Sequence, residues 1–454
     1  MSKLSRIYVD TCLRPDSGLA DAVARATLPP AFDAAWRTHL LPRPWFVSAP
    51  QTAAFARDLD GLFDLLVSLP ARLFDGDLDR YAAEVGIGPE PAALLRRAGS
   101  GVPAKLGRAD AYHDGTSFKL LEFNIGSEAA GLDMAVFNRG MLGVPEFAAF
   151  ADEHGLDHVD IAARTAAVLR DRARPAVSGG AEPVIGLIEG RGGVAAYGRI
   201  MRATVEAMAE QGLDLRIGEI GDVRARPDGK LALDGTPLDL VLRNFAASQL
   251  LDDPAGPAAA EPFFRAHESG RTILFTTLES GYYAHKSALA LLTDPRWSGA
   301  FDADERALVD RVLPWSRTLS APGGSGTGSP AASRELLDLC RERRERLILK
   351  PGGGYGGFGT HVGWELTDAE WAEALRGAAE RGGHVVQERV VPCPEPVYDP
   401  GTGAVEDWIA VIGAFLTDDG YAGAHARVNR VDGGAIVGLS SNPGTRMVGV
   451  FSHP

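Results

Sequence analysis

RADAYHDGTSFKLLEFN, residues 108–124, sets four polar side chains on two short strands that a turn can fold together. Successive strand residues point to opposite faces of a sheet, and residues two apart share a face. Arg108 therefore shares a face with Asp110, and Glu122 shares a face with Asn124. We expect the two polar pairs to meet on one side of a hairpin.

The length of the turn decides whether the two pairs meet. A two-residue turn at Asp114 and Gly115 would put Asp110 and Glu122 on opposite sides of the hairpin. A five-residue loop over 114–118 would place them directly opposite each other, and loops of that length are common in hairpins. The sequence therefore predicts the five-residue loop.

The second strand has an apolar face as well as a polar one. Leu121 and Phe123 alternate with the polar residues and are expected to pack on a core. On the polar face, Asp110, Glu122 and Asn124 offer the oxygen ligands that Mg²⁺ takes in nucleotide enzymes, usually together with substrate phosphates. The same residues also fit a solvated hairpin face with ordinary surface charges, and the hairpin alone leaves both interpretations open.

Length and composition indicate a globular protein of enzyme size. A chain of 454 residues, 45% hydrophobic and 23% charged, predicts two or three domains without disulfides. No apolar run approaches the length of a membrane span, and residues 1–10 lack a signal-peptide core, so we expect a cytoplasmic protein without a membrane partner. Cys12, Cys340 and Cys393 are too few and too scattered for a disulfide framework or a zinc site.

The net charge argues against nucleic acid as a partner. With 60 acidic and 46 basic residues, the formal charge is −14, the opposite of the basic surface that phosphate-backbone binders display. An acidic protein that handles nucleotides must gather its Lys and Arg locally. The positions of individual lysines and arginines therefore carry information.

The middle of the chain has a strand, helix, strand pattern. Residues 183–190 and 213–220 are apolar strands, and residues 197–212 between them have helical periodicity. Residues 239–245 predict a further strand. This order indicates a parallel, Rossmann-like α/β unit over 181–275.

The last third of the chain begins with a segment rich in Gly, Ser and Pro. Residues 321–333, APGGSGTGSPAAS, predict a mobile loop. Helices are expected over 334–346 and 368–382, and a strand over 384–391. Residues 408–450 predict short strands and turns.

KPGGGYGGFG, residues 350–359, contains a GxGxxG pattern at Gly354, Gly356 and Gly359. Alone, the pattern is a weak signal. A dinucleotide site needs a helix directly after the glycines, but residues 360–366, THVGWEL, alternate as a strand does. Dinucleotide binding is therefore disfavoured.

Two other glycine-rich sites also fail to fit. A Walker A loop ends in Lys-Ser or Lys-Thr, whereas here Thr360 and His361 follow the glycines, and no kinase HRD or DFG sequence lies downstream. The remaining interpretation is a glycine-rich hairpin whose backbone N–H groups, with Lys350, fold over a triphosphate. A plain surface loop is the alternative.

The order strand, Lys350, glycine-rich hairpin, helix and strand, ending in VVQERVVPCPEP at 385–396, resembles the lid and adenine-binding hinge of ATP-grasp enzymes. The polar hairpin precedes this lid instead of following the hinge. That inversion resembles the circularly permuted ATP-grasp enzymes related to glutathionylspermidine synthase. The resemblance implies an α/β, circularly permuted ATP-grasp fold with a Rossmann-like pre-ATP-grasp domain. Its implied parts are an N-terminal part with the metal hairpin at 1–180, the Rossmann-like domain at 181–275, and the lid, hinge and remaining core strands at 276–454.

The resemblance assigns roles to the polar residues. It implies that Asp110, Glu122 and Asn124 bind Mg²⁺ and that Arg108, the catalytic candidate, faces the γ-phosphate or an acyl-phosphate. The implied nucleotide-binding residues are Lys286, Lys350, Gly353, Gly354, Tyr355, Gly356, Gly357, Gln387, Glu388, Arg389, Val390, Glu395 and Arg427.

Within that set the implied contacts differ. The two lysines and the glycine-rich segment would contact the phosphates, and Arg427 is a further triphosphate candidate. Gln387, Glu388 and Val390 would border adenine, and Glu395 would bind the ribose.

Residues 125–140, IGSEAAGLDMAVFNRG, depart from the family, whose members usually carry a stretch with proline and threonine there. Because the acceptor substrate should sit at this point, the substrates of the family do not transfer. The resemblance implies an ATP- and Mg²⁺-dependent carboxylate–amine ligase that joins small molecules, amino acids or peptides among them, through an acyl-phosphate. A small-molecule kinase and a non-catalytic nucleotide-binding scaffold are the alternatives.

Overall fold

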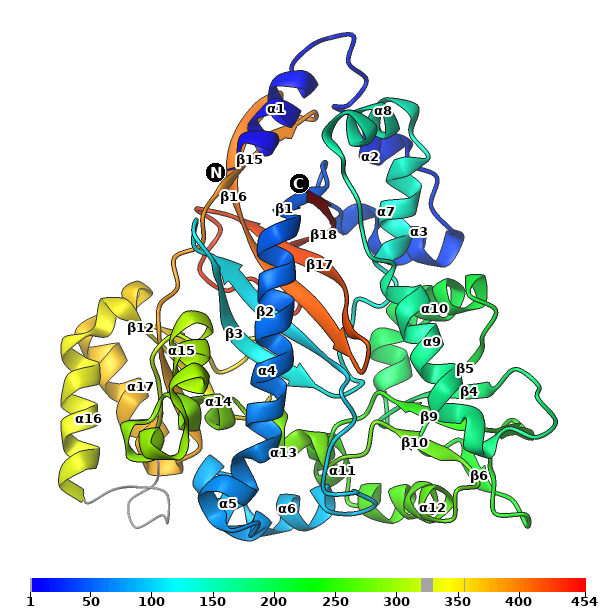
Figure 1. Cartoon of the computed structure of the whole chain (residues 1–454), viewed down its shortest axis with the longest axis vertical. Coiled ribbons are helices and arrows are strands. Elements are labelled where there is room, and N and C mark those ends of the chain that lie inside the picture. The colour runs from blue at the N-terminus through cyan, green and yellow to red at the C-terminus, as the bar shows by residue number, and fades with distance from the viewer. Residues whose placement is uncertain (1, 320–329, 355) are drawn as a thin grey trace.

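A seven-stranded sheet runs through the centre of the computed structural model, which describes residues 2–319, 330–354 and 356–454 (Figure 1). Its order is β1-β18-β17-β16-β2-β3, and β15 pairs with the N-terminal half of β16. The strands are β1 (Trp45–Ser48), β2 (Gly107–His113), β3 (Phe118–Ile125), β15 (Glu395–Asp399), β16 (Ala404–Thr417), β17 (Gly420–Arg430) and β18 (Arg446–His453). The early hairpin thus joins C-terminal strands, which are longer than the short strands predicted there.

The β2–β3 hairpin confirms the predicted pairing but not the predicted loop. Asp110 lies opposite Glu122, and Arg108 lies opposite Asn124. The loop has four residues, 114–117, because Oδ1 of Asp114 accepts hydrogen bonds from the backbone N–H groups of Thr116 (2.8 Å) and Ser117 (2.9 Å). This local side-chain bonding is typical of a tight turn.

A β-bulge restores the pairing that a four-residue loop would otherwise lose. Asp110 pairs with Glu122, but Ala111 pairs with Leu120, so Leu121 is an extra residue in β3. The prediction that Leu121 packs on the core beside Phe123 is therefore wrong. Phe123 is buried in the core, whereas Leu121 lines a cavity on the other side of the sheet.

Helices cover the large sheet. The long helix α4 (Ala49–Phe74) lies across it in Figure 1. Phe55 of this helix stacks on Phe118 with ring centroids 4.9 Å apart, and Phe63 meets Phe123 edge-on with centroids 6.4 Å apart. The N-terminal helices are α1 (Lys3–Cys12), α2 (Ala22–Arg25), α3 (Pro30–Trp36), α4 (Ala49–Phe74), α5 (Leu78–Val85) and α6 (Pro89–Leu95). Helices α7 (Ala135–Leu142), α8 (Pro145–His154) and α9 (Ile161–Ala173) follow the hairpin.

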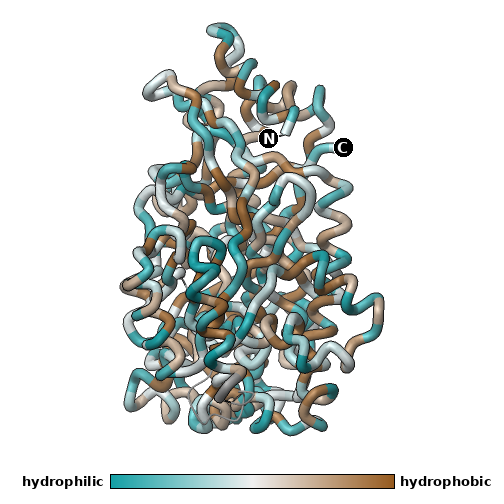
Figure 2. Tube along the Cα trace, turned by 90° about the vertical axis from the view of Figure 1, so that its left-hand side faces the viewer, coloured by the Kyte–Doolittle hydropathy of each residue, from teal (hydrophilic) through white to brown (hydrophobic). Residues whose placement is uncertain are grey.

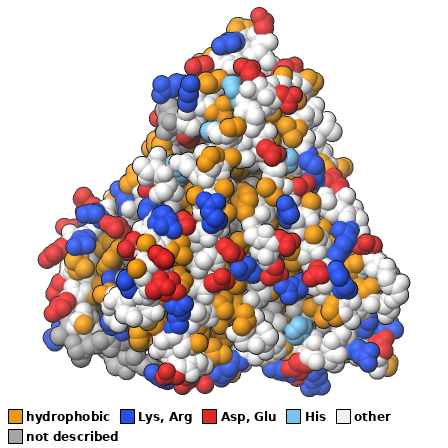
Figure 3. Space-filling view, in the orientation of Figure 1, with side chains coloured by type: hydrophobic (Ala, Val, Ile, Leu, Met, Phe, Trp, Pro, Cys, Tyr) orange, Lys and Arg blue, Asp and Glu red, His pale blue; other side chains and the backbone are white. Residues whose placement is uncertain are grey.

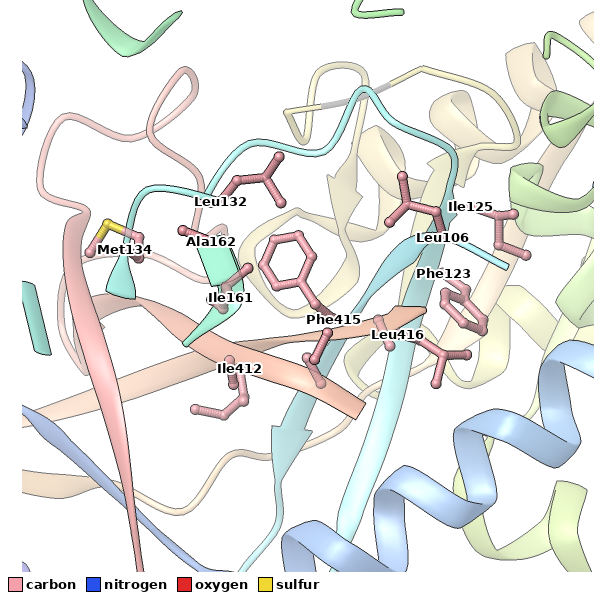
Figure 4. Packing of buried hydrophobic residues seen from close by; sticks show 14 of the residues in the cluster. Leu106, Phe123, Ile125, Leu132, Met134, Ile161, Ala162, Ile412, Phe415 and Leu416 are labelled. Atoms are coloured by element: carbon pink, nitrogen blue, oxygen red, sulfur yellow. The ribbon is translucent and has the colours of Figure 1, made fainter. Parts of the chain in front are cut away.

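Both sides of the large sheet are packed at its centre. Figure 4 shows Phe415 of β16 between Leu132 and Ala162, while Leu416, the next residue, lies toward Phe123. All five side chains are buried. Because neighbouring strand residues face opposite sides, one strand contributes to two apolar layers and fixes the hairpin between them.

A second sheet is wholly parallel, with the order β10-β9-β4-β5. It confirms the predicted strand, helix, strand unit and its further strand. Its elements are β4 (Val184–Glu189), α10 (Gly193–Glu210), β5 (Asp214–Glu219), β9 (Leu240–Arg243) and β10 (Ile273–Phe275). A small antiparallel sheet of β6 (Val223–Ala225), β7 (Leu231–Leu233) and β8 (Thr236–Leu238) and the helices α11 (Ala247–Asp252) and α12 (Gly256–Glu268) complete this part.

A third, antiparallel sheet with the order β11-β14-β12-β13 carries the glycine-rich segment. Its strands are β11 (Ser316–Leu319), β12 (Leu347–Pro351), β13 (His361–Val362) and β14 (His384–Glu388), with helices α16 (Pro330–Glu342) and α17 (Asp368–Arg381) packed on them. The strand predicted over 360–366 is wrong beyond Val362, because residues 363–365 form a 3-10 turn, η5. Of the loop predicted over 321–333, residues 321–329 lie outside the described residues and 330–333 belong to α16.

The remaining elements link the three sheets. They are α13 (Ser280–Ala284), α14 (Lys286–Thr293), α15 (Ala303–Val312) and the 3-10 turns η1 (Arg37–His39), η2 (Arg174–Ala176), η3 (Pro295–Ala300) and η4 (Arg344–Arg346). Apolar segments run through the interior of the trace in Figure 2, and acidic and basic side chains are interspersed on the face in Figure 3. Among the described residues, no helix is long and apolar enough to cross a membrane.

Candidate functional site

A cavity of about 620 Å³ lies between the large sheet and the sheet of the glycine-rich segment. One wall comes from the β2–β3 hairpin and from β16 and β17, and the other comes from β12, β14 and residues 353–354 and 356–358. The segments 389–394 and 431–437 close two further sides. The cavity therefore gathers both sequence regions that the motifs singled out.

One end of the cavity is apolar. Its buried cluster consists of Tyr112, Ile409, Val411 and Val437, with Leu121 and Val390 packed against it. Tyr112 lies two residues after Asp110 on β2, so strand alternation alone would have indicated its direction. The other members carry no motif, and sequence reasoning missed all but Val390.

The other end is charged, and Asp110 is at its centre. Arg108 Nε and Nη2 donate to the two carboxylate oxygens of Asp110 at 2.7 and 3.0 Å, and Arg427 Nη2 donates to Oδ2 at 2.6 Å. Burial by itself would raise the pKa of Asp110, but the two guanidinium groups outweigh burial and hold that pKa well below its usual range. Asp110 is therefore ionised at any working pH.

Glu122 and Asn124 complete the polar face of the hairpin. Lys286 Nζ lies 3.2 Å from Glu122 Oε2, and Asn124 Nδ2 lies 3.1 Å from Asp110 Oδ2 and 3.4 Å from Glu122 Oε1. Within residues 2–319, 330–354 and 356–454, no group of three or more His, Cys, Asp or Glu side chains could hold a metal. Two carboxylates and an amide nevertheless fit Mg²⁺, which takes few protein ligands and completes its shell with water and phosphate oxygens.

Two lysines face the carboxylates from the opposite side. Lys350 of β12 is half-buried, and its Nζ lies 2.8 Å from Gln387 Oε1. Burial lowers the pKa of Lys350, Glu122 raises it and Lys286 lowers it, and the net result is a pKa of about 8. Lys286 begins α14, and its Nζ also donates to the carbonyl of Gly354 at 3.2 Å.

Arg427 has unused hydrogen-bonding capacity in the cavity. It lines the cavity, and its buried Nε has no hydrogen-bond partner among the described residues. A guanidinium group offers five N–H donors in a planar fork that matches phosphate oxygens. Arg427 is thus a better placed guanidinium than the sequence suggested.

The glycine-rich segment packs on the loop after β17. Gly354, Gly356, Gly357 and Gly359 have φ between 70° and 87°, the left-handed region that glycine adopts without strain. A Cβ atom on Gly357 would lie only 2.8 Å from Cγ2 of Ile436, so the two segments meet with no room for a side chain. Tyr355, also predicted to bind nucleotide, lies outside the described residues.

The predicted hinge lies beside the apolar end. Val390 packs there, and the Arg389 guanidinium lies 4.1 Å from the ring centroid of Trp364 in a cation–π contact. Glu388 Oε1 accepts from Arg346 Nη2 at 2.8 Å on the rim. Gln387 is turned away from this end, because its amide bonds Lys350.

Three predicted residues are missing from the described lining of the cavity: Arg108, Asn124 and Glu395. Arg108 is 9% exposed and lies behind Asp110, where its Nη1 donates to the carbonyl of Ala130 at 2.8 Å. Glu395 is buried elsewhere and accepts a 2.6 Å hydrogen bond from the backbone N–H of Ser2. The structure therefore does not bring Glu395 to the place expected of a ribose ligand.

The loop after the hairpin leads to a second polar cluster, at the carboxyl edge of the parallel sheet. Arg243 is fully buried there, donates to the carbonyl of Thr276 at 2.6 Å and pairs with Glu128 of the loop. Ser127 Oγ donates to the carbonyl of Arg243 at 2.6 Å. The strand order reverses between β4 and β9, and ligands of open parallel sheets bind in the crevice at that point.

No protein-family model matches the sequence, and no curated protein does either. Solved structures do resemble the chain, 48 chains in all, including the following three. A glutathione synthetase-like effector from Globodera pallida is 12% identical, with a TM-score of 0.57 over 98% of this chain and 97% of its own. A gamma-glutamylcysteine synthetase-like protein from Methylobacillus flagellatus is 14% identical, with a TM-score of 0.42 over 90% and 89% of the two chains.

The third is D-alanyl-alanine synthetase A from Vibrio cholerae, 10% identical, with a TM-score of 0.31 over 60% of this chain and 89% of its own. At these identities only the first likeness carries an argument, and it shows a shared fold. The chain therefore has a mixed α/β structure and shares its fold with the glutathione synthetase-like effector.

Proposed function

We propose that the chain is an ATP-dependent carboxylate–amine ligase that forms an amide or peptide bond and releases ADP and phosphate. One observation carries the proposal: a single cavity has an apolar end beside a hinge and, at its other end, two carboxylates facing three cationic side chains. An adenine ring and a triphosphate have that same division of apolar and charged surface. The shared fold with a glutathione synthetase-like protein supports the proposal.

The nucleotide has one favoured orientation in this cavity. The base lies among Tyr112, Val411 and Val390, and the phosphates point toward Lys286 and Lys350. The backbone N–H groups of the glycine-rich segment cover the phosphates, as in other sites where consecutive N–H groups bind anions.

Asp110 and Glu122, with Asn124, would hold Mg²⁺. The ion, when bound, neutralises phosphate charge and orients the transferred group. In the structure the two carboxylates carry Arg427 and Lys286 as counter-charges. Nucleotide binding would draw these cations toward the phosphates and free carboxylate oxygens for the metal.

The chemistry needs positioning and charge more than a covalent nucleophile. The substrate carboxylate attacks the γ-phosphoryl group, ADP leaves, and an amine then displaces phosphate from the acyl-phosphate and loses a proton. Arg427 is placed to stabilise the transferring phosphoryl group. Arg108, which the sequence suggested for that task, instead holds Asp110 in position.

We place the acid and the amine between the end of the hairpin and the crevice at Arg243. Residues 126–131 connect these two places, and Ser127 and Glu128 contact the crevice directly. An amino acid or a peptide fits a site lined by hydroxyl, carboxylate and guanidinium groups.

The proposal includes the circular permutation and its parts. The hairpin of residues 107–125 precedes the glycine-rich segment in sequence but shares a sheet with β16, β17 and β18. This arrangement favours a permuted ATP-grasp enzyme related to glutathionylspermidine synthase, with the divisions 1–180, 181–275 and 276–454.

An ADP-release screen tests the function. Pools of amino acids and amines are added to the protein with Mg·ATP, and ADP is followed by a coupled assay. We expect ADP only when both an acid and an amine are present, with an amide product by mass spectrometry. A phosphorylated product that needs no amine would identify a kinase, and ATP binding without turnover in every pool would favour a scaffold.

A further inference from the structure

Gln387 lies where the two walls of the cavity meet, and its side-chain amide contacts both. Its Oε1 accepts from Lys350 Nζ at 2.8 Å, while Nε2 lies 3.4 Å from the carbonyl of Leu121 and 3.3 Å from Ser316 Oγ. The residue is 5% exposed. The amide is therefore committed to these three residues and has little left for a base.

Lys350 has its hydrogen bonds arranged around this amide. Its Nζ also lies 3.5 Å from the carbonyl of Leu121. An ammonium group has three N–H donors, so two are directed at neutral acceptors and one is left for the cavity. Among the described residues, no carboxylate forms an ion pair with Lys350.

The bulge in β3 supplies the second acceptor. Leu121 is the extra residue of the bulge and has no partner residue on β2. Its carbonyl lies near the side chains of both Lys350 and Gln387. Bulges commonly redirect groups next to functional sites. The hairpin that carries Glu122 is thus connected to the lysine of the opposite sheet.

We propose that Gln387 is a positioning residue, which fixes Lys350 Nζ toward the β-phosphate without neutralising its charge. The inference rests on the proposed nucleotide site. A glutamate at this position would keep the acceptor oxygen but form a buried ion pair with the lysine. A methionine would keep the volume and lose all three hydrogen bonds.

The test measures dissociation constants of ATP and adenosine by calorimetry for the wild type, Gln387→Met, Gln387→Glu, Lys350→Met and the double variant Gln387→Met/Lys350→Met. Gln51→Met is the control, because the Gln51 amide bonds the carbonyl of Thr116 outside the cavity. Thermal unfolding of each variant checks that it is folded.

We expect both Gln387 variants to weaken ATP binding by about tenfold or more, since hydrogen bonds to charged groups are the strong ones, and to change adenosine binding less than twofold. The loss should vanish in the Lys350→Met background, because a positioning residue acts only through its partner. An equal loss for adenosine, an additive double variant, or wild-type ATP affinity in folded Gln387→Met would each overturn the inference. A wild-type protein that binds adenosine nucleotides nowhere would instead overturn the proposed function beneath it.

Discussion

On the large-sheet wall of the cavity, Asp110 and Glu122 are held by strand pairing between β2, β3 and β16. On the opposite wall, residues 353–354 follow β12 and residues 356–359 lead to the two-residue β13, and a 2.8 Å hydrogen bond joins Gly352 N–H to the Gly383 carbonyl at their base. The first wall is fixed by strand pairing and a packed core. The second is fixed by contacts with the loop after β17.

This difference separates two tasks of the proposed ligase. Groups that meet the reacting atoms need fixed geometry, since small displacements cost rate. Groups that cover a nucleotide must let it in and out, and glycine-rich segments with few internal contacts can do so. We call the wall that carries Asp110 and Glu122 the sheet wall, and the wall formed by the glycine-rich segment the glycine wall. Changes on the sheet wall should therefore affect turnover, and changes on the glycine wall should affect nucleotide binding.

The largest effect is expected at Glu122. Glu122→Gln keeps the shape of the side chain but removes a carboxylate from the metal site, so turnover should fall by roughly a thousandfold or more. Steady-state ADP release measures the loss. Glu406→Gln is the control, since Glu406 pairs with Arg430 on the same sheet, outside the cavity lining. Near-normal turnover in Glu122→Gln would remove the hairpin from the metal site.

The next effect separates two arginines on the sheet wall. Arg427→Met should lower kcat by roughly a hundredfold and change the ATP dissociation constant much less, because the guanidinium acts on the transferring group. Arg108→Met should instead lower the free energy of unfolding by about 3 kcal/mol, the usual loss when a buried ion pair is broken.

Single-turnover rates and urea unfolding distinguish the two variants. If Arg108→Met lost turnover as Arg427→Met does while keeping its stability, Arg108 would have the role that the sequence resemblance implied. The division of tasks between the two walls would still hold, but the guanidinium that acts on the transferring phosphoryl group would be that of Arg108.

The hairpin could be predicted from the sequence because strand alternation is a local property. The pairing of Asp110 with Glu122 was predicted correctly although the loop is shorter than expected. The bulge at Leu121 was not predicted, because the carbonyl of Leu121 contacts side chains of the other sheet, which strand alternation does not encode. The burial of Arg108 could not be predicted. It follows from the close approach of Gly413, where a Cβ atom would lie 2.8 Å from Arg108 Cδ, and Gly413 is three hundred positions away in the sequence.

The glycine wall was predicted in kind but not in detail. Six glycines in ten residues indicate a segment without fixed side-chain packing, whereas its partner, the loop at Ile436, carries no motif. Glu395 differs from the loop at Ile436, because its surrounding sequence resembles a motif but its observed position does not follow from that motif. It follows a hinge-like sequence, but its position depends on the packing of α1, which the hinge sequence does not encode.

A smaller effect is expected on the glycine wall. Gly357→Ala adds a methyl group at φ +76° and 2.8 Å from Ile436, so the segment must shift to accept it. We expect ATP binding to weaken by about tenfold with kcat nearly unchanged, measured by calorimetry and steady-state kinetics. The control is Gly221→Ala, where the new methyl group would have no neighbour within 4 Å. A loss confined to kcat would contradict the division of tasks.

The smallest effect concerns stability and pH. The pKa of Lys350 is about 8 in the folded chain and ordinarily 10.5, so between these values the unfolded chain holds a proton that the folded chain lacks. The penalty of burying the ammonium is therefore complete below pH 8 and disappears as the pH approaches 10.5. This lysine should make the free energy of unfolding rise by roughly 1 to 3 kcal/mol across that window.

Urea unfolding at pH 7.5 and pH 10 measures the rise, and Lys350→Met should remove it. Lys119→Met, on the outer part of β3, serves as the control for a lysine outside the cavity lining. An unchanged pH dependence in Lys350→Met would mean that the ammonium is well solvated and that this wall is more open than the structure indicates.

The bulge at Leu121 also makes the hairpin tolerant of engineering at its tip. The correct pairing of Asp110 and Glu122 is restored inside the strand, beyond the turn at 114–117, so a side chain at the tip can be replaced while the turn keeps its length. Thr116 is exposed there and suits a cysteine that carries a fluorescent dye. Such a label would lie outside the cavity lining, in a protein whose described cysteines, Cys12, Cys340 and Cys393, form no disulfide and two of which are buried.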